Sequence, residues 1–196
     1  MNNSAEEALQ SLINRSQRYN KEISPDSIIA WGERLEPVFF KNKQYKELFE
    51  TKYIIAQTHA MRGDISLAID KVNFMSEDAQ KLNYDLGFAL ASQAVGDTYI
   101  YSNMLPEAIA SYKQALEILD NNPKLVTSKK RLLVRLLQAY LLGDDLKETQ
   151  HYLNQFNHIL PENDTDDPLY VFRLAFMPSI TSKSTDWMKQ EIILTS

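Results

Sequence analysis

Apolar residues recur along most of this chain at intervals of three and four positions rather than two. One series runs from Ile65 to Leu82, a second from Leu105 to Leu119, and a third from Leu133 to Leu141. Such spacing gathers apolar side chains on one face of a helix, and no alternating series flanked by turn residues competes with it. The sequence therefore predicts an all-α protein with helices over residues 4–19, 25–42, 45–62, 65–82, 84–102, 105–121, 124–142, 145–160 and 168–177, and a further piece at 185–194.

Short polar segments separate the predicted helices. Tight turns are predicted at Arg62-Gly63-Asp64, Ser102-Asn103 and Gly143-Asp144-Asp145, since these residue types favour turns. Ser24-Pro25 predicts an N-cap followed by proline at the first helical position, where the missing N–H costs nothing. Pro37 falls inside the predicted helix 25–42. Because an interior proline costs about 3 kcal/mol, we expect this helix to kink or to restart there.

The middle of the chain contains a recognisable pattern of small and aromatic residues. Gly96 and Tyr99 on one predicted helix are followed by Ala108, Tyr112 and Ala115 on the next. This arrangement resembles the tetratricopeptide repeat (TPR) family, whose repeats are pairs of antiparallel helices. Small residues belong where two helices cross closely, so we expect Ala108 to face Gly96 and the tyrosines to fill the neighbouring gaps.

The same pattern recurs on both sides. A shift of 40 residues carries Ala108 back onto Ala68, and a shift of 41 carries it forward onto Thr149. The usual TPR period is about 34 residues, and the longer period is similar to repeats of bacterial signalling proteins. The resemblance implies a single right-handed superhelical solenoid of antiparallel helix pairs over residues 1–196. Its parts would be a helical hairpin at 4–42, repeats at 45–83, 84–123 and 124–160, and an irregular part at 161–196.

In the family that the chain resembles, the first helices of successive repeats line a concave wall that binds a peptide or a partner's helix. The resemblance places ten residues on that wall: Tyr53, Gln57 and Met61 from the first repeat, Gln93, Asp97 and Tyr101 from the second, and Arg131, Val134, Gln138 and Leu142 from the third. Arg135, which forms a basic pair with Arg131, is a further candidate for contact with a partner. Polar groups along such a wall can bond to the main chain of a partner. The alternative is that they form the solvated face that every surface helix has.

One binding mode of the family fits poorly. Chaperone adaptors of this family hold a peptide's terminal carboxylate with basic and asparagine residues on three first helices. Arg131 and Arg135 match the basic pair of the third helix. However, Tyr53 and Gln57 replace the lysine and asparagine of the first helix, and Ala94 replaces the asparagine of the second. The sequence argues against a two-carboxylate clamp and leaves open a single acidic contact to either arginine.

Composition narrows the class of function. The 196 residues include 21 Lys and Arg, 26 Asp and Glu and no Cys, for a formal charge of −5. An acidic chain argues against a nucleic-acid partner. The lack of cysteine removes disulfides, thiolate metal sites and cysteine nucleophiles, and it leaves the compartment undecided. No apolar run approaches the roughly 18 residues of a membrane span, so no membrane insertion is predicted for this chain.

The remaining charged residues have ordinary explanations. The one dense basic run predicts a solvated helix face, and it consists of Lys124, Lys129, Lys130, Arg131 and Arg135. The acidic run at 162–167 predicts a linker that ends in a helix cap, because carboxylates favour helix N-termini.

No catalytic motif is present. His59, His151 and His158 fit no metal-binding or nucleophile pattern, and we expect His59 to be packed and hydrogen-bonded. We therefore predict that the chain is not an enzyme and needs no cofactor or metal.

Two kinds of function remain, and both involve a protein or peptide ligand. The first is the sensory or regulatory part of a larger bacterial signalling protein, and the alternative is a free-standing scaffold, adaptor or dimerisation module. The last ten residues, Trp187 to Ser196, end apolar. This suggests either that the chain is a piece of a longer protein or that its C-terminal region docks on another surface, for instance in a homodimer.

Overall fold

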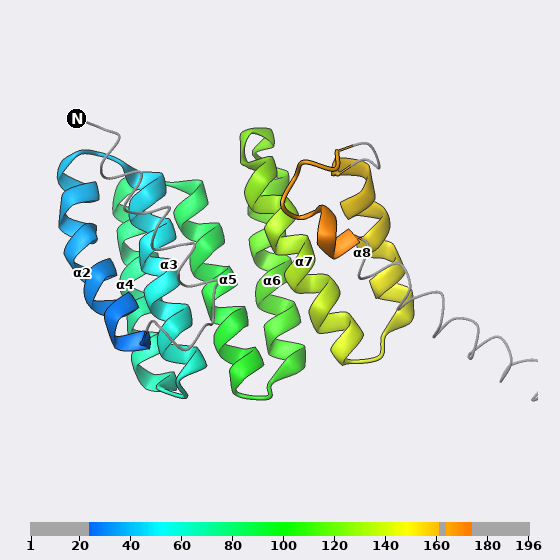
Figure 1. Cartoon of the computed structure of the whole chain (residues 1–196), viewed down its shortest axis with the longest axis horizontal. Helices are drawn as coiled ribbons and strands as arrows, with labels where there is room; N and C mark the ends of the chain where they lie inside the picture. Colours follow the sequence, from blue (N-terminus) through cyan, green and yellow to red (C-terminus); the bar gives the residue numbers. More distant parts are fainter. Residues whose placement is uncertain (1–23, 161–163, 174–196) are drawn as a thin grey trace, which may run out of the picture. The chain divides into compact units, whose positions relative to one another are not determined.

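The computed structural model describes residues 24–160 and 164–173 (Figure 1). Within these residues every regular element is helical, which confirms the predicted all-α fold, and the helix bounds agree with the predicted ones to within two residues. The elements are α2 (Pro25–Lys41), α3 (Tyr45–Met61), α4 (Ile65–Leu82), α5 (Asp85–Tyr101), α6 (Leu105–Asp120), the 3₁₀ turn η1 (Pro123–Leu125), α7 (Val126–Leu142) and α8 (Leu146–Ile159).

The two ends of the chain are described in part. The helices predicted at 4–19 and 185–194 lie outside the described residues. Of the helix predicted at 168–177, the described part is helical from Tyr170 to Arg173. It begins two residues later than predicted because Asp167 closes a turn first: its Oδ1 accepts a hydrogen bond from Leu169 N at 2.8 Å and its carbonyl accepts one from Tyr170 N at 2.9 Å.

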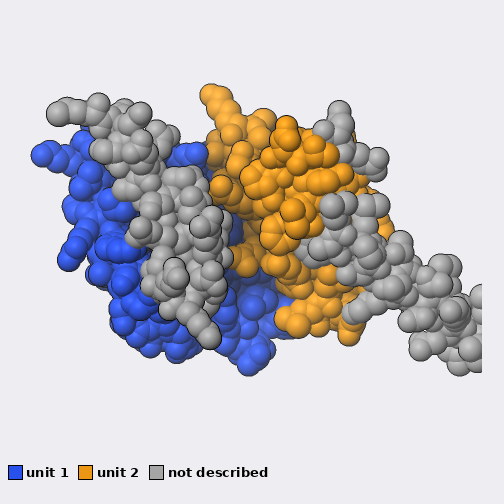
Figure 2. Space-filling view, in the orientation of Figure 1, with its two compact units in different colours: residues 1–118 blue, residues 119–196 orange. Residues whose placement is uncertain are grey.

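The chain divides into two compact units, residues 1–118 and residues 119–196 (Figure 2). In the first unit α3 contacts α2, α4 and α5, and α4 also contacts α5. In the second unit α7 contacts η1 and α8. The single domain over 1–196 stays a prediction. None of the described helices is both long and apolar enough to cross a membrane.

Five turns between helices share one backbone geometry. In each turn one residue has a positive φ, and the five residues are Lys43, Gly63, Asn83, Asn103 and Asp144. The N–H that follows each of them bonds to the carbonyl five residues earlier, as in Tyr84 N to Ala79 O at 3.0 Å. This is the Schellman ending of a helix. The first four turns are spaced 20 residues apart, so a helix plus its turn takes 20 residues and a helix pair takes 40.

The predicted crossing of small residues is confirmed. A Cβ atom added at Gly96 would lie 2.4 Å from Cε1 of Tyr112 and 3.1 Å from the carbonyl oxygen of Ala108. Ala108 is fully buried and Tyr112 is 2% exposed. Glycine therefore lets α5 approach α6 closely enough for the tyrosine ring to fill the space that a side chain would take.

The predicted restart at Pro37 is wrong. Ser24 accepts a hydrogen bond from Ser27 N and caps α2 as predicted, but α2 then runs without a break through Pro37 to Lys41. Pro37 is exposed, so the carbonyl of Glu33, which loses its helical donor, lies on a solvated face of the helix. Packing of Phe39, which is fully buried, favours continuation of the helix past the proline.

A cation joins three helices of the first unit. Lys52 Nζ on α3 lies 2.9 Å from Glu36 Oε2 on α2 and 3.1 Å from Asp78 Oδ2 on α4. Burial lowers the pKa of Lys52, but the hydrogen bonds and charges of the two carboxylates outweigh it and raise the pKa above 10.5.

Candidate functional site

The wall residues predicted on α3 and α5 meet in the first unit. These helices are the first members of the helix pairs α3–α4 and α5–α6, and they contact each other. Tyr53 and Gln57 face Gln93 and Asp97 across this contact. Since Tyr53 precedes Gln93 by 40 residues and Gln57 precedes Asp97 by 40, equivalent positions of neighbouring repeats bond to each other.

Five side chains form one hydrogen-bonded group, here named the Asp97 cluster: Tyr53, Gln57, Gln93, Asp97 and Tyr112. Asp97 Oδ2 accepts from Tyr53 Oη at 2.6 Å and from Gln57 Nε2 at 2.9 Å. Asp97 Oδ1 accepts from Tyr112 Oη at 2.6 Å. Tyr53 Oη in turn accepts from Gln57 Nε2 at 3.1 Å and from Gln93 Nε2 at 2.9 Å. The cluster therefore ties together α3, α5 and α6.

The Asp97 cluster is buried at its centre and partly open at its edge. Asp97 is 2% exposed and Gln93 is 7% exposed, whereas Tyr53 and Gln57 are half-buried. The sequence places Asp97 on the wall itself, but the structure puts it beneath the surface with both carboxyl oxygens bonded. A partner on this wall would meet Tyr53 and Gln57, and the binding role of all four residues stays a prediction.

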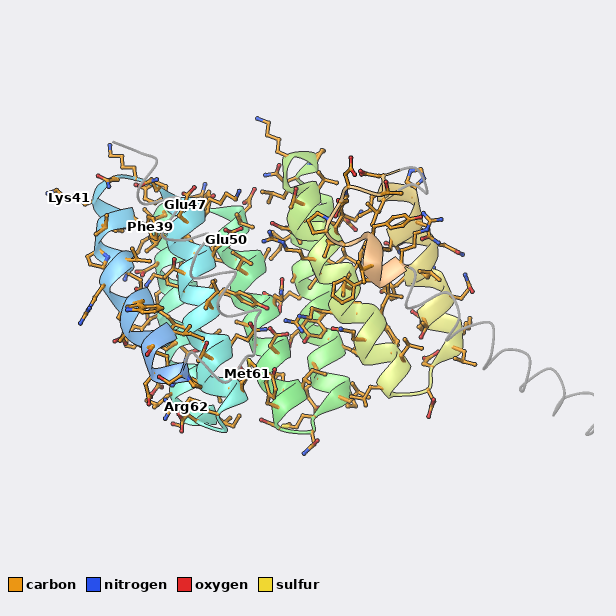
Figure 3. All side chains as sticks on the ribbon, in the orientation of Figure 1. Phe39, Lys41, Glu47, Glu50, Met61 and Arg62 are labelled. Carbon is orange, nitrogen blue, oxygen red and sulfur yellow. The ribbon has the colours of Figure 1, made fainter. Side chains whose placement is uncertain are left out.

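Two apolar side chains stand one helical turn beyond the cluster. Met61 follows Gln57 by four residues near the end of α3, where Figure 3 labels it. Tyr101 follows Asp97 by four residues and ends α5. Tyr101 is 42% exposed and Met61 is half-buried, so this end of the wall offers apolar surface.

The residues predicted from the third repeat belong to the second unit, on α7. Arg131 and Gln138 are exposed, and Arg135 is half-buried. Leu142 is 68% exposed at the end of the helix, whereas Val134 is buried, with 5% exposure. Their place on a common wall with α3 and α5 stays a prediction.

Sequence reasoning missed the hydrogen bond that Tyr112 makes. The pattern identified this residue as a packing residue of α6, which it is, but its hydroxyl also completes the Asp97 cluster. Because Asp97 and Tyr112 lie on different helices 15 residues apart, no local motif links them. The signal that could have indicated this bond is the place of Asp97, which directly follows Gly96, the glycine that faces Tyr112.

The histidines differ partly from expectation. His59 is packed, with 8% exposure, but its Nδ1 has no hydrogen-bond partner among the described residues, contrary to prediction. The nearest carboxylate oxygen, Asp64 Oδ2, lies 3.7 Å away. No group of three potential metal ligands occurs in the part of the chain that the structure describes.

The basic run of α7 is not simply solvated. Lys129 pairs with Asp120 at 2.6 Å, and Lys130 pairs with Asp167 at 2.7 Å. Burial raises the pKa of Asp167, but hydrogen bonds from Lys130 and Leu169 N and the charge of Arg131 lower it below 3.8. Lys130 thus holds Asp167, the last residue of the predicted acidic linker, against α7.

Comparison with known proteins identifies the type of fold but no family. No protein-family model matches the chain, and no curated protein sequence matches it. Among solved structures it is similar to the apo form of RapI, with 14% identity, a TM-score of 0.58, and coverage of 96% of this chain and 71% of RapI. At this identity the likeness shows the fold alone, and the chain has an all-α helical-repeat, solenoid-type fold.

Proposed function

We propose that this chain is a protein-interaction module that binds a peptide or a segment of a partner along the wall formed by α3 and α5. The observation that carries the proposal is the Asp97 cluster. It holds Tyr53 and Gln57 in fixed positions at the edge of the wall through bonds to a buried carboxyl group. Side chains that are fixed before binding lose less conformational entropy when a partner arrives.

The apolar end of the wall supports the same function. Tyrosine is enriched among the residues that dominate binding energy, and Tyr101 exposes 42% of its surface beside the polar cluster. A surface that combines an aromatic anchor with fixed polar groups suits an extended peptide or a helix.

The wider role that we propose is the regulatory part of a larger bacterial signalling protein. The 40-residue spacing of equivalent turns, which is longer than the usual TPR period, supports this role.

Selection of dodecapeptides from a phage-displayed library on the full chain tests the binding function. Fluorescence polarisation then measures the affinity of synthetic copies of the selected peptides for variants. Tyr101→Ala is expected to weaken binding by about tenfold, since it removes an exposed anchor of the wall. Phe74→Ala is the matched control, because Phe74 is 59% exposed on α4, which is not part of the wall. Equal losses in both variants, or a larger loss with Phe74→Ala, would contradict the proposal.

A further inference from the structure

The direction of the hydrogen bonds in the Asp97 cluster fixes how its two glutamine side chains are turned. Tyr53 Oη gives its only proton to Asp97 Oδ2, so the Tyr53 oxygen can only accept from its other neighbours. It accepts from Nε2 of both Gln57 and Gln93. Each amide therefore turns its NH₂ group toward the cluster and its carbonyl oxygen away from it.

The two amide oxygens remain available as acceptors. Neither Gln57 Oε1 nor Gln93 Oε1 takes part in a hydrogen bond within the described residues. Neither is one of the fully buried unpartnered side-chain atoms there, which are Thr51 Oγ1, His59 Nδ1 and Asn157 Oδ1. Because both Nε2 atoms bond to one tyrosine oxygen, they lie no more than about 6 Å apart. The wall thus has two neighbouring amide groups, one on α3 and one on α5, whose oxygens accept no hydrogen bond within the described residues.

We infer that this part of the wall binds an arginine side chain of the partner segment; the inference rests on the proposed function. A guanidinium group carries five N–H donors in a rigid planar fork and no acceptor, which suits two acceptors on adjacent helices. It also stacks on aromatic faces, and Tyr101 stands one turn beyond Asp97 with 42% exposure. A carboxylate at the same place would meet two amide oxygens close to the carboxyl group of Asp97, so acidic peptides are disfavoured.

The selected dodecapeptides test this inference through the peptide rather than the protein. Replacing the arginine by citrulline keeps its shape but removes the charge and two of the five N–H donors, and puts an acceptor oxygen in their place. Replacing it by lysine keeps the charge but removes the fork. We expect arginine-containing peptides to dominate the selection. Citrulline should weaken their binding about tenfold, and lysine about threefold.

Variants of the chain locate the effect. Gln57→Met and Gln93→Met each remove one acceptor oxygen, and Gln114→Met on α6 is the exposed control. In the first two variants the loss caused by citrulline should shrink from about tenfold to about threefold, whereas the control should keep the full loss. Thermal unfolding checks that each variant is folded. If a variant does not fold, the loss of affinity that citrulline causes on the unaltered chain tests the arginine inference instead.

The outcomes separate the two proposals. Peptides that need Tyr101 but are not weakened by citrulline, or that are acidic, would overturn the arginine inference and leave the proposed function standing. Failure to obtain any peptide whose affinity depends on Tyr101 would overturn both.

Discussion

The helix pairs α5–α6 and α7–α8 solve the same packing problem with different residues. Gly96 and Tyr112 meet in the first pair, and a shift of 41 residues places Leu137 and Leu153 at the equivalent positions of the second. Leu137 is fully buried and Leu153 is 4% exposed. A glycine and a large aromatic in one pair thus correspond to two leucines of intermediate size in the other.

The difference explains why the Asp97 cluster forms where α5 packs on α6. Tyr112 brings a hydroxyl into the interior, and a buried hydroxyl needs a partner; Asp97 supplies it. Leu153 brings no hydroxyl, and Gln138, at the position equivalent to Asp97, is exposed. The polar wall of α3 and α5 is therefore a consequence of how α5 packs on α6.

We expect the largest effects on stability from variants that place the residues of one repeat at the equivalent positions of another. The pair α3–α4 has Ala56 and Val72 at the positions of Gly96 and Tyr112. We expect Tyr112→Val to lower the free energy of unfolding by about 4 kcal/mol through a cavity, and Gly96→Ala by about 2 kcal/mol through overpacking. The double variant should cost at least about 1 kcal/mol less than the two separate losses together, because valine makes room for the new methyl group. Urea unfolding measures all three, and strict additivity would contradict the proposed packing.

Removal of the central carboxyl group should be nearly as damaging. Asp97→Ala leaves the hydroxyls of Tyr53 and Tyr112 without their acceptor, and we expect a loss of about 3 kcal/mol of unfolding free energy. The matched control is Gln138→Ala, which should change stability by less than about 0.5 kcal/mol because Gln138 is exposed. Similar losses in both variants would show that the two equivalent positions do not differ as the structure indicates.

The Lys52 ion pairs predict an alkaline limit in the first unit. Because the folded pKa of Lys52 is raised above 10.5, the stability that it contributes is fully present below that pH and is lost as pH rises through the folded pKa. Lys52→Met should therefore cost about 1 kcal/mol near pH 8, and the difference from the unaltered chain should shrink above about pH 10.5. A difference that grows with pH would contradict this assignment.

The Asp167 contact predicts the opposite limit in the second unit, with the smallest effect. Its folded pKa is lowered below 3.8, so its contribution is present above that pH and disappears as pH falls through the folded value. Asp167→Asn should cost less than about 1 kcal/mol at pH 7. Unfolding curves recorded from pH 7 to pH 2 measure the difference in unfolding free energy between the variant and the unaltered chain, which should fall toward zero. A difference that stays constant would contradict the ion pair with Lys130.

Much of the fold could be predicted from the sequence because it depends on local spacing. The stripe around Ala108 and Tyr112 predicts α6, and Asn103 predicts the turn before it. The structure differs from the prediction at Pro37 because the cost of the proline is local. The burial of Phe39, which outweighs that cost, depends on parts of the fold that are distant in the sequence.

The candidate site could be predicted only in part. The 40-residue shift brings Gln57 and Asp97 to equivalent positions, but it does not say that they bond to each other. The burial of Asp97 depends on the hydroxyl of Tyr112, and the turning of the Gln93 amide depends on the single proton of Tyr53. These hydrogen bonds depend on distances between helices, and the spacing of residues along the chain gives no information about those distances.

Hydrogen–deuterium exchange of the full chain with and without a selected dodecapeptide tests the central claim most directly. The account predicts slower exchange on binding in the second half of α3 and of α5, around Gln57 and Tyr101, and little change in the solvent-facing part of α4 around Phe74. Protection confined to α4, or no protection in α3 and α5 at a saturating peptide concentration, would contradict it.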